Sequence, residues 1–188
     1  SNKRFREKIL IKDPRQKEAK VMLQALIAKS RDGETLDITS KVEPDGTLNW
    51  KPAAGEMELT AAFCGKTLQR VKRAAPGGEG LSLDHFSAKA LRVYLKRFDD
   101  AFSTEDIGIR SFFNDSYEVY GSNWTEEMFD EFEKRRGYPL EPWLRELTNW
   151  EDSSDVAKRI RYDYRQTLSD LLLENFTQNW TAWSHKKK

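Results

Sequence analysis

Two polar clusters, each directly after a short apolar run, contain the residue types best suited to chemistry. One cluster follows residues 81–83 and the other follows residues 112–113. In parallel α/β proteins the loops that leave the carboxyl ends of strands build the active site, so polar groups at those ends are the first candidates. The candidates are Asp84 and His85 in the first cluster and Asn114, Asp115, Tyr117 and Glu118 in the second.

Glu118 is the candidate for proton transfer. It lies between Tyr117 and Val119, and Tyr120 follows. Aromatic neighbours exclude water, and exclusion of water raises the pKa of a carboxyl group, which a general acid needs near neutral pH. The competing interpretation is an ordinary solvated glutamate in a surface loop.

The other polar residues each allow two interpretations. His85 suits a contact with a substrate hydroxyl or a carboxylate, and it equally suits a hydrogen bond to a backbone carbonyl. Asp84 and Asp115 carry the oxygen ligands that hard cations prefer, yet aspartates in loops also cap helices and form turns. Glu79 lies in a glycine-rich loop that lacks the following Gly-Lys-Ser of a phosphate loop, so a plain turn is favoured there.

Composition restricts the class of protein. The 188 residues are 38% hydrophobic and 34% charged with a formal net charge of +1, which is typical of a globular protein and gives no reason to expect nucleic acid or membrane partners. One cysteine, Cys64, excludes an internal disulfide and a cysteine-based zinc site, and two histidines argue against a His-rich metal site. Six tryptophans suit either a core or flat platforms for sugar rings.

The first part of the chain, residues 1–76, is predicted to be a small β-rich antiparallel unit. Short apolar or alternating runs are separated by turn signals at Asp32-Gly33, Asp45-Gly46 and Ala54-Gly55. The predicted strands are residues 21–28, 35–38, 47–50, 57–63 and 67–71. The glycine-rich stretch at residues 74–80 marks the expected boundary.

The second part, residues 77–188, alternates strand and helix signals. The predicted elements are strands at residues 81–86 and 107–113 and helices from Ser87 to Phe102, from Thr125 to Gly137 and from about Asp155 to Trp183. Alternating strands and helices favour parallel pairing with right-handed crossovers. The predicted fold class is therefore α/β for this part, a barrel or an open sheet, and α+β for the whole chain.

Several unusual blocks of the second part occur together and in order. They are residues 75–87 (APGGEGLSLDHFS), 112–119 (FFNDSYEV), 123–125 (NWT), 132–138 (FEKRRGY), 162–165 (YDYR) and 168–171 (LSDL). In these blocks the chain resembles the bacterial α-L-rhamnosidases of glycoside hydrolase family 106. The resemblance extends from Ala74 to the end, and the first 73 residues match only loosely, as the β-rich insertion that precedes the blocks.

The resemblance implies a piece of a large multidomain enzyme whose catalytic module is a (β/α)8 barrel. Such an enzyme removes terminal α-L-rhamnose with inversion and uses calcium at the sugar site. Inversion needs one carboxylic acid and one carboxylate roughly 6.5 to 9.5 Å apart. Glu118 matches the family's catalytic glutamate in the Asp-Ser-Tyr-Glu block, with the acid role favoured, and the second glutamate of the family lies on a later barrel strand.

On this basis the chain is expected to be a partial barrel that supplies one catalytic residue and is inactive alone. The residues expected to bind the sugar are Asp84, His85, Asn114, Asp115, Tyr117 and Trp124. The metal ligands are not identified. A rhamnose-containing plant or bacterial glycan is the expected partner, in polysaccharide degradation, and the expected location is periplasmic or extracellular.

Two alternatives stay open. The chain suits a non-catalytic carbohydrate-binding module with Trp50, Trp124, Trp180 and Trp183 as platforms, or a purely structural fragment. Self-association is also expected, because the apolar face of the last helix must be covered. The covers considered for it are the β-rich unit and a second copy of the chain.

Overall fold

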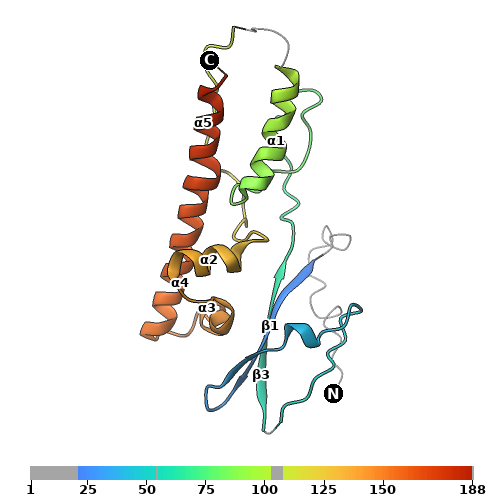
Figure 1. The fold of residues 1–188 in the computed structure, drawn as a ribbon, viewed down its shortest axis with the longest axis vertical. Coiled ribbons are helices and arrows are strands. Elements are labelled where there is room, and N and C mark those ends of the chain that lie inside the picture. The colour runs from blue at the N-terminus through green and yellow to red at the C-terminus, as the bar shows by residue number, and fades with distance from the viewer. Residues whose placement is uncertain (1–20, 54, 103–107, 188) are drawn as a thin grey trace. The chain divides into compact units, whose positions relative to one another are not determined.

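The computed structural model describes residues 21–53, 55–102 and 108–187 (Figure 1). Residues 1–20 of the expected β-rich unit, Ala54 of one expected turn and Ile107 of one expected strand lie outside them. The chain divides into two compact units: residues up to 66 with residues 129–163, and residues 67–128 with residues 164–188. The composition of the units differs from the expected segments, and a domain boundary at residue 76 stays a prediction.

The first unit is built on a three-stranded antiparallel sheet. The strands β1 (Met22–Ser30), β2 (Thr35–Asp37) and β3 (Met57–Cys64) lie in the order β2-β1-β3. The Asp32-Gly33 turn forms as predicted between β1 and β2, with Gly33 at a φ of 90°. Four consecutive residues at the middle of β1, Ala25–Ala28, are buried. Continuous burial is typical of a strand covered on both faces.

The core of this unit lies beside β1. Leu26, Ala28, Ile38 and Leu48 form a buried cluster. The short helices η4 (Glu141–Trp143) and α3 (Leu144–Thr148), which the sequence analysis did not predict, also pack on the sheet. Glu146 of α3 is 7% exposed and pairs with Lys29 of β1 at 2.5 Å, which compensates a carboxylate that would be costly to bury alone.

A buried arginine holds the end of α3. The Arg161 guanidinium donates to the backbone carbonyls of Glu146, Asn149 and Asp152. The ring of Trp150 lies 5.7 Å from the guanidinium carbon. The five donors of arginine suit this role, because one side chain satisfies several carbonyls at a helix end.

The second unit is built on one helix and on the part of a longer helix that begins at Tyr164. Helix α1 (Ala88–Ala101) begins at the predicted cap, since the Ser87 side chain accepts a hydrogen bond from the Ala90 N–H at 3.3 Å. The long helix runs as α4 (Asp155–Leu171), the π-helical segment η5 (Leu172–Gln178) and α5 (Asn179–His185). Figure 1 shows α1 alongside the C-terminal part of this helix. Their shared core contains Leu91, Leu95 and Phe176.

This packing corrects the expectation about how the long helix is covered. Trp180 and Trp183 are partly buried against the α1 core in their own chain. Neither the β-rich unit nor a second copy is needed to cover them, because α1 presents a complementary apolar face. Self-association stays a prediction, but the need to cover Trp180 and Trp183 no longer supports it.

Helix α2 (Met128–Arg136) begins later than predicted. The Thr125 side chain is held by other residues, and regular helix starts only at Met128, whose N–H bonds the Thr125 carbonyl. The predicted end at Gly137 is confirmed, with a φ of 81° that a glycine adopts without strain. No helix in the described part of the chain is long and apolar enough to cross a membrane.

Four predicted strands do not form. Residues 47–50 and 67–71 contribute only isolated bridges, Val42 with Leu48 and Arg70 with Leu81. The last of these is the sole pairing of the predicted strand at residues 81–86 in the described chain, and residues 108–113 lie outside any strand. A strand requires a partner over several consecutive residues, and the described residues offer these segments single bridges at most. The fold class is therefore α+β with a small antiparallel sheet, and a partial barrel is not confirmed.

Phe176→Ala tests the contact between the two helices of the second unit. Phe176 is 7% exposed, and truncation of a buried phenylalanine typically costs about 3 to 5 kcal/mol of unfolding free energy. Leu173→Ala in the same π-helical segment is the matched control, because Leu173 is 51% exposed and the expected cost is within about 0.5 kcal/mol. Denaturant titration followed by circular dichroism measures both. Equal costs for the two variants would contradict this packing.

Candidate active site

A tight turn before α1 connects the predicted site residues of the second unit. The Asp84 carboxylate accepts the Phe86 N–H at 2.9 Å through Oδ1 and the Thr125 hydroxyl at 2.8 Å through Oδ2. Thr125 is buried, and its hydroxyl also lies 3.0 Å from Glu127 Oε2. Asp84 therefore holds its own turn and ties it to the segment that carries Trp124.

His85 is half-buried between aromatic rings. Its ring meets Tyr117 edge-on at 5.1 Å between centroids and lies 4.4 Å from the ring of Phe176. Its Nδ1 is 3.0 Å from the Leu83 carbonyl, and this contact favours the tautomer with a proton on Nδ1. Burial lowers the pKa of His85, so the ring is neutral at neutral pH. Of its two predicted roles, the bond to a backbone carbonyl is observed, and Nε2 remains as an acceptor.

The loop that carries Glu118 is held from behind by a residue that the sequence analysis did not single out. The Gln69 side-chain amide donates to the Glu118 carbonyl at 2.6 Å and accepts the Tyr120 N–H at 2.8 Å. The backbone carbonyl of Gln69 in turn accepts a hydrogen bond from the Ser82 N–H at 2.8 Å. Gln69 therefore connects the loop of the second cluster with residue 82, in the run that precedes the first cluster.

No sequence signal could have identified Gln69. A glutamine that binds the backbone of a loop 49 residues away has no local pattern, because its partners are main-chain atoms that every residue carries. Only the tertiary arrangement shows the contact.

The described residues do not provide the aromatic shelter that the sequence predicted for Glu118. The Tyr117 ring turns toward His85 and Phe86, and the Tyr120 ring lies 5.7 Å from the Lys72 amine. Both rings are occupied elsewhere, so the Glu118 side chain is exposed. The Ser116 hydroxyl approaches its Oε1 at 3.4 Å.

The remaining candidates divide into two groups. Asn114 and Asp115 are exposed in the loop, and the Asp115 carboxylate accepts the Ser116 N–H at 2.8 Å, as turn-forming aspartates do. Trp124 lies 6.2 Å from the ring of Tyr164, whose hydroxyl donates to the Asn123 carbonyl. Burial raises the pKa of Tyr164 to about 12.

The structure thus brings Asp84, His85 and Tyr117 together, places Glu118 next to them in the chain, and joins Trp124 to Asp84 through Thr125. The use of calcium, which the family resemblance implies, stays a prediction. No group of three or more His, Cys, Asp or Glu in the part of the chain described here could hold a metal ion. Both oxygens of Asp84 are already engaged in holding the turn.

The lowered pKa of His85 predicts a pH-dependent stability of the second unit. The unfolded chain takes up a proton at this histidine near pH 6.5, whereas the folded chain resists it to a lower pH. The contribution of neutral His85 to the unfolding free energy is fully present above about pH 6.5 and decreases as the pH falls below that value.

We expect His85→Gln to flatten the decrease in unfolding free energy between about pH 7 and pH 5. The readout is the slope with pH, measured by denaturant titration at each pH, so a constant offset from altered packing does not matter. His185→Gln, at the exposed histidine near the end of α5, should leave the slope unchanged. A parental slope in His85→Gln would show that His85 does not contribute.

A family profile and two relatives are similar to this chain. The profile of glycoside hydrolase family 106, described as alpha-L-rhamnosidase, matches residues 3–188. A protein of Formosa agariphila named “Putative beta-glucuronidase” is 31% identical over 172 residues, which cover 87% of this chain and 14% of that protein. The solved rhamnosidase from Novosphingobium sp. PP1Y is 31% identical with a TM-score of 0.65, over 81% of this chain and 16% of that one.

The chain therefore spans about one sixth or less of the length of these two relatives. The profile match covers nearly every residue, including most of the first 73, whose sequence resembles the family only loosely. The chain belongs to glycoside hydrolase family 106, the α-L-rhamnosidase family.

Proposed function

We propose that this chain is the part of a larger inverting α-L-rhamnosidase that supplies the proton donor, Glu118. The substrate class is a glycan of plant or bacterial origin with terminal rhamnose, met in the periplasm or outside the cell during polysaccharide degradation. Family membership supports the chemistry of glycoside hydrolysis. The choice of Glu118 rests on its match to the family's Asp-Ser-Tyr-Glu block and on the way the loop that carries it is held.

The observation that carries the assignment is the way the chain holds this loop. Gln69 binds the main chain on both sides of Val119, and Tyr117 is anchored on the His85 ring. The chain around Glu118 is therefore held at residues 117, 118 and 120, while the Glu118 side chain stays exposed. A general acid needs this combination, because it must be positioned by the protein and must also reach the substrate.

The neighbouring groups suit the recognition of a sugar. His85 is neutral, and its Nε2 does not take part in the Leu83 contact, so Nε2 can accept a hydrogen bond from a sugar hydroxyl. Asp84 and Thr125 position these groups, because their mutual hydrogen bond keeps the turn at Asp84 together with the segment that carries Trp124. We assign the contact with substrate to His85, Tyr117 and Trp124 and a positioning role to Asp84.

An inverting reaction needs a second carboxylate that activates water. We propose that it comes from the parent protein beyond this chain, and that the isolated chain is consequently inactive. In the parent, residues 81–83 and 108–113 would gain strand partners and become part of a (β/α)8 barrel. The described residues supply no group of three or more His, Cys, Asp or Glu that could hold a metal ion, so we assign no calcium ligand within this chain.

The carbohydrate-binding alternative receives little support from the aromatic residues of the last helix. The Trp183 ring packs against Phe98 and Phe112, and its Nε1–H donates to Asp99 at 2.8 Å. Trp180 is also partly buried in the α1 core. Rings committed to a core on one face are poor platforms for a sugar.

Glu118→Gln in the full-length parent tests the catalytic assignment. The amide has the same shape but cannot transfer a proton, and general acid catalysis is worth about 10² to 10⁴-fold, so kcat should fall by at least 10²-fold on an aryl α-L-rhamnoside. Glu151→Gln, at an exposed glutamate of the first unit, is the control and should keep the parental rate. An aryl β-D-glucuronide assayed in parallel separates the two substrate classes. Near-parental turnover of the rhamnoside by Glu118→Gln would show that another residue is the acid.

Gln69→Leu tests whether the loop must be held for catalysis. Loss of both hydrogen bonds frees the backbone of residues 118–120, and a displacement of about 1 Å can cost on the order of 10²-fold in rate. We expect kcat to fall about 10- to 100-fold with little change in KM. Gln69→Leu combined with Glu118→Gln should be no slower than Glu118→Gln alone, because Gln69 acts through Glu118.

The control for Gln69 is Gln166→Leu, because the Gln166 amide in the same unit donates to a neighbour on its own helix, Asp170, at 2.9 Å. It should leave kcat unchanged. If the rate of the double variant fell well below that of Glu118→Gln, Gln69 would be acting independently of Glu118, and the positioning role would be wrong.

A further inference from the structure

The first unit carries a cavity with its own chemistry. It has a volume of about 370 Å³ and is lined by Lys41, Asn49, Trp50 and Lys51. Small-molecule sites in proteins typically measure about 300 to 1,000 Å³, so one sugar unit fits. The lining contains an aromatic ring, an amide and two cations, and it contains no carboxylate.

A short hairpin holds these residues in place. The Asn49 N–H donates to the Lys41 carbonyl at 2.9 Å, and Val42 pairs with Leu48 next to them. The turn between them is closed by Asp45, whose carboxylate accepts the N–H and the hydroxyl of Thr47. Lys41 and Asn49 are therefore fixed opposite each other on a braced backbone.

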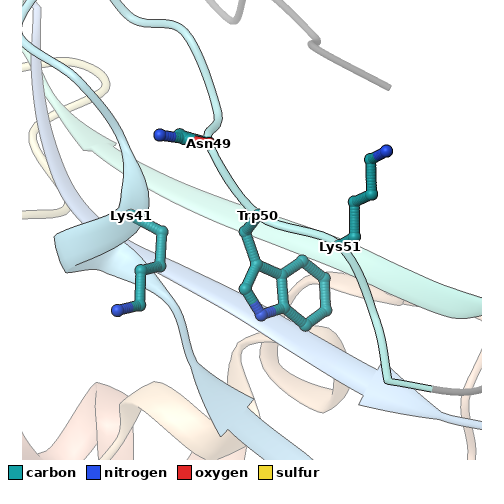
Figure 2. Close-up of a pocket in the computed structure, with 4 residues that line it drawn as sticks. All are labelled: Lys41, Asn49, Trp50 and Lys51. Carbon is teal, nitrogen blue, oxygen red and sulfur yellow. The ribbon is translucent and has the colours of Figure 1, made fainter.

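Trp50 provides a rigid floor. Its ring packs on the buried cluster of the first unit and is only partly exposed, so one part is anchored while another lines the cavity. A ring held in this way offers a flat apolar surface at little cost in side-chain entropy. Figure 2 shows the Lys41 side chain and the Trp50 ring extending in the same direction, downward in this view. The Lys51 side chain extends upward.

The charge in this cavity is uncompensated within the described chain. Neither Lys41 nor Lys51 forms an ion pair with a residue that the structure describes. An ammonium group beside an aromatic floor suits a ligand with a carboxylate at one end of an apolar face. The Asn49 amide, which both donates and accepts, suits a hydroxyl group of the same ligand.

We propose that this cavity, the Trp50 site, binds a carboxylate-bearing sugar, a uronic acid unit of a glycan. The carboxylate pairs with Lys41, the C–H face of the ring stacks on Trp50, and Asn49 binds a hydroxyl. The site lies in the first unit and its occupancy does not depend on Glu118, so it stands or fails separately from the proposed catalytic role.

Titration of the 188-residue chain with D-glucuronate, followed by the indole N–H resonances of its tryptophans, tests the proposal. Trp50→Phe identifies the Trp50 resonance by its disappearance. We expect that resonance to shift with a dissociation constant on the order of 1 mM, as suits a single small sugar on an open site. D-Glucose, a ring without charge, and acetate, a charge without a ring, should shift it at least about fivefold more weakly.

Two exposed substitutions locate the contact without disturbing the core. Lys41→Gln should weaken glucuronate binding about two- to fivefold, whereas Lys158→Gln, which removes the same charge from an exposed position on α4 in the first unit, should leave it unchanged. Equal effects of the two lysine variants, equal binding of acetate, or no shift of the Trp50 resonance at about 10 mM glucuronate would overturn the proposal.

Discussion

The second unit depends on one side chain, Phe176, which packs on the α1 core and on the His85 ring at the same time. The helix that supplies it widens to a π-helix over this stretch, and the adjacent Asn175 side chain donates to the Phe86 carbonyl at 2.7 Å. Core packing and the candidate site are thus joined through two consecutive residues. π-Helical segments are often found at functional sites, where the extra residue per turn directs side chains that a regular helix would not.

The widened segment is stabilised locally by polar side chains. The Thr177 hydroxyl donates to the Leu172 carbonyl, and the Asn179 amide donates to the carbonyls of Glu174 and Asn175. These contacts satisfy main-chain acceptors whose geometry the π-helix disturbs. The sequence of the segment therefore contains both the interruption and the groups that compensate it.

In the candidate active site the side chain of Glu118 is exposed while the main chain beside it is held in place. The Glu118 side chain is exposed, whereas the main chain on either side is held by Gln69 and Tyr117. An exposed carboxylate in this chain is consistent with the small share of the two relatives that it covers, because a sugar and the rest of the site would have to approach from that side. In the proposed parent enzyme, that approach would provide the exclusion of water that strengthens electrostatic catalysis.

The sequence alone determined the features that depend on near neighbours. Ser87 capped α1 and Gly137 ended α2 as predicted, and the turn after β1 formed at Asp32-Gly33, because each of these depends on the backbone preference or hydrogen bonding of residues within one turn. The family was also recognised correctly, since its blocks are read along the chain.

The tertiary structure decided everything that needed a distant partner. Residues 81–83 and 108–113 have strand-like sequences without forming the predicted parallel strands, because the described chain provides no continuous strand to pair with them. The sequence also did not predict the hydrogen bonds of Gln69 or the packing of α1 on Trp183. The residues in contact are separated by tens of residues along the chain. Residue types establish what each group can bind, and only the folded chain determines which group it meets.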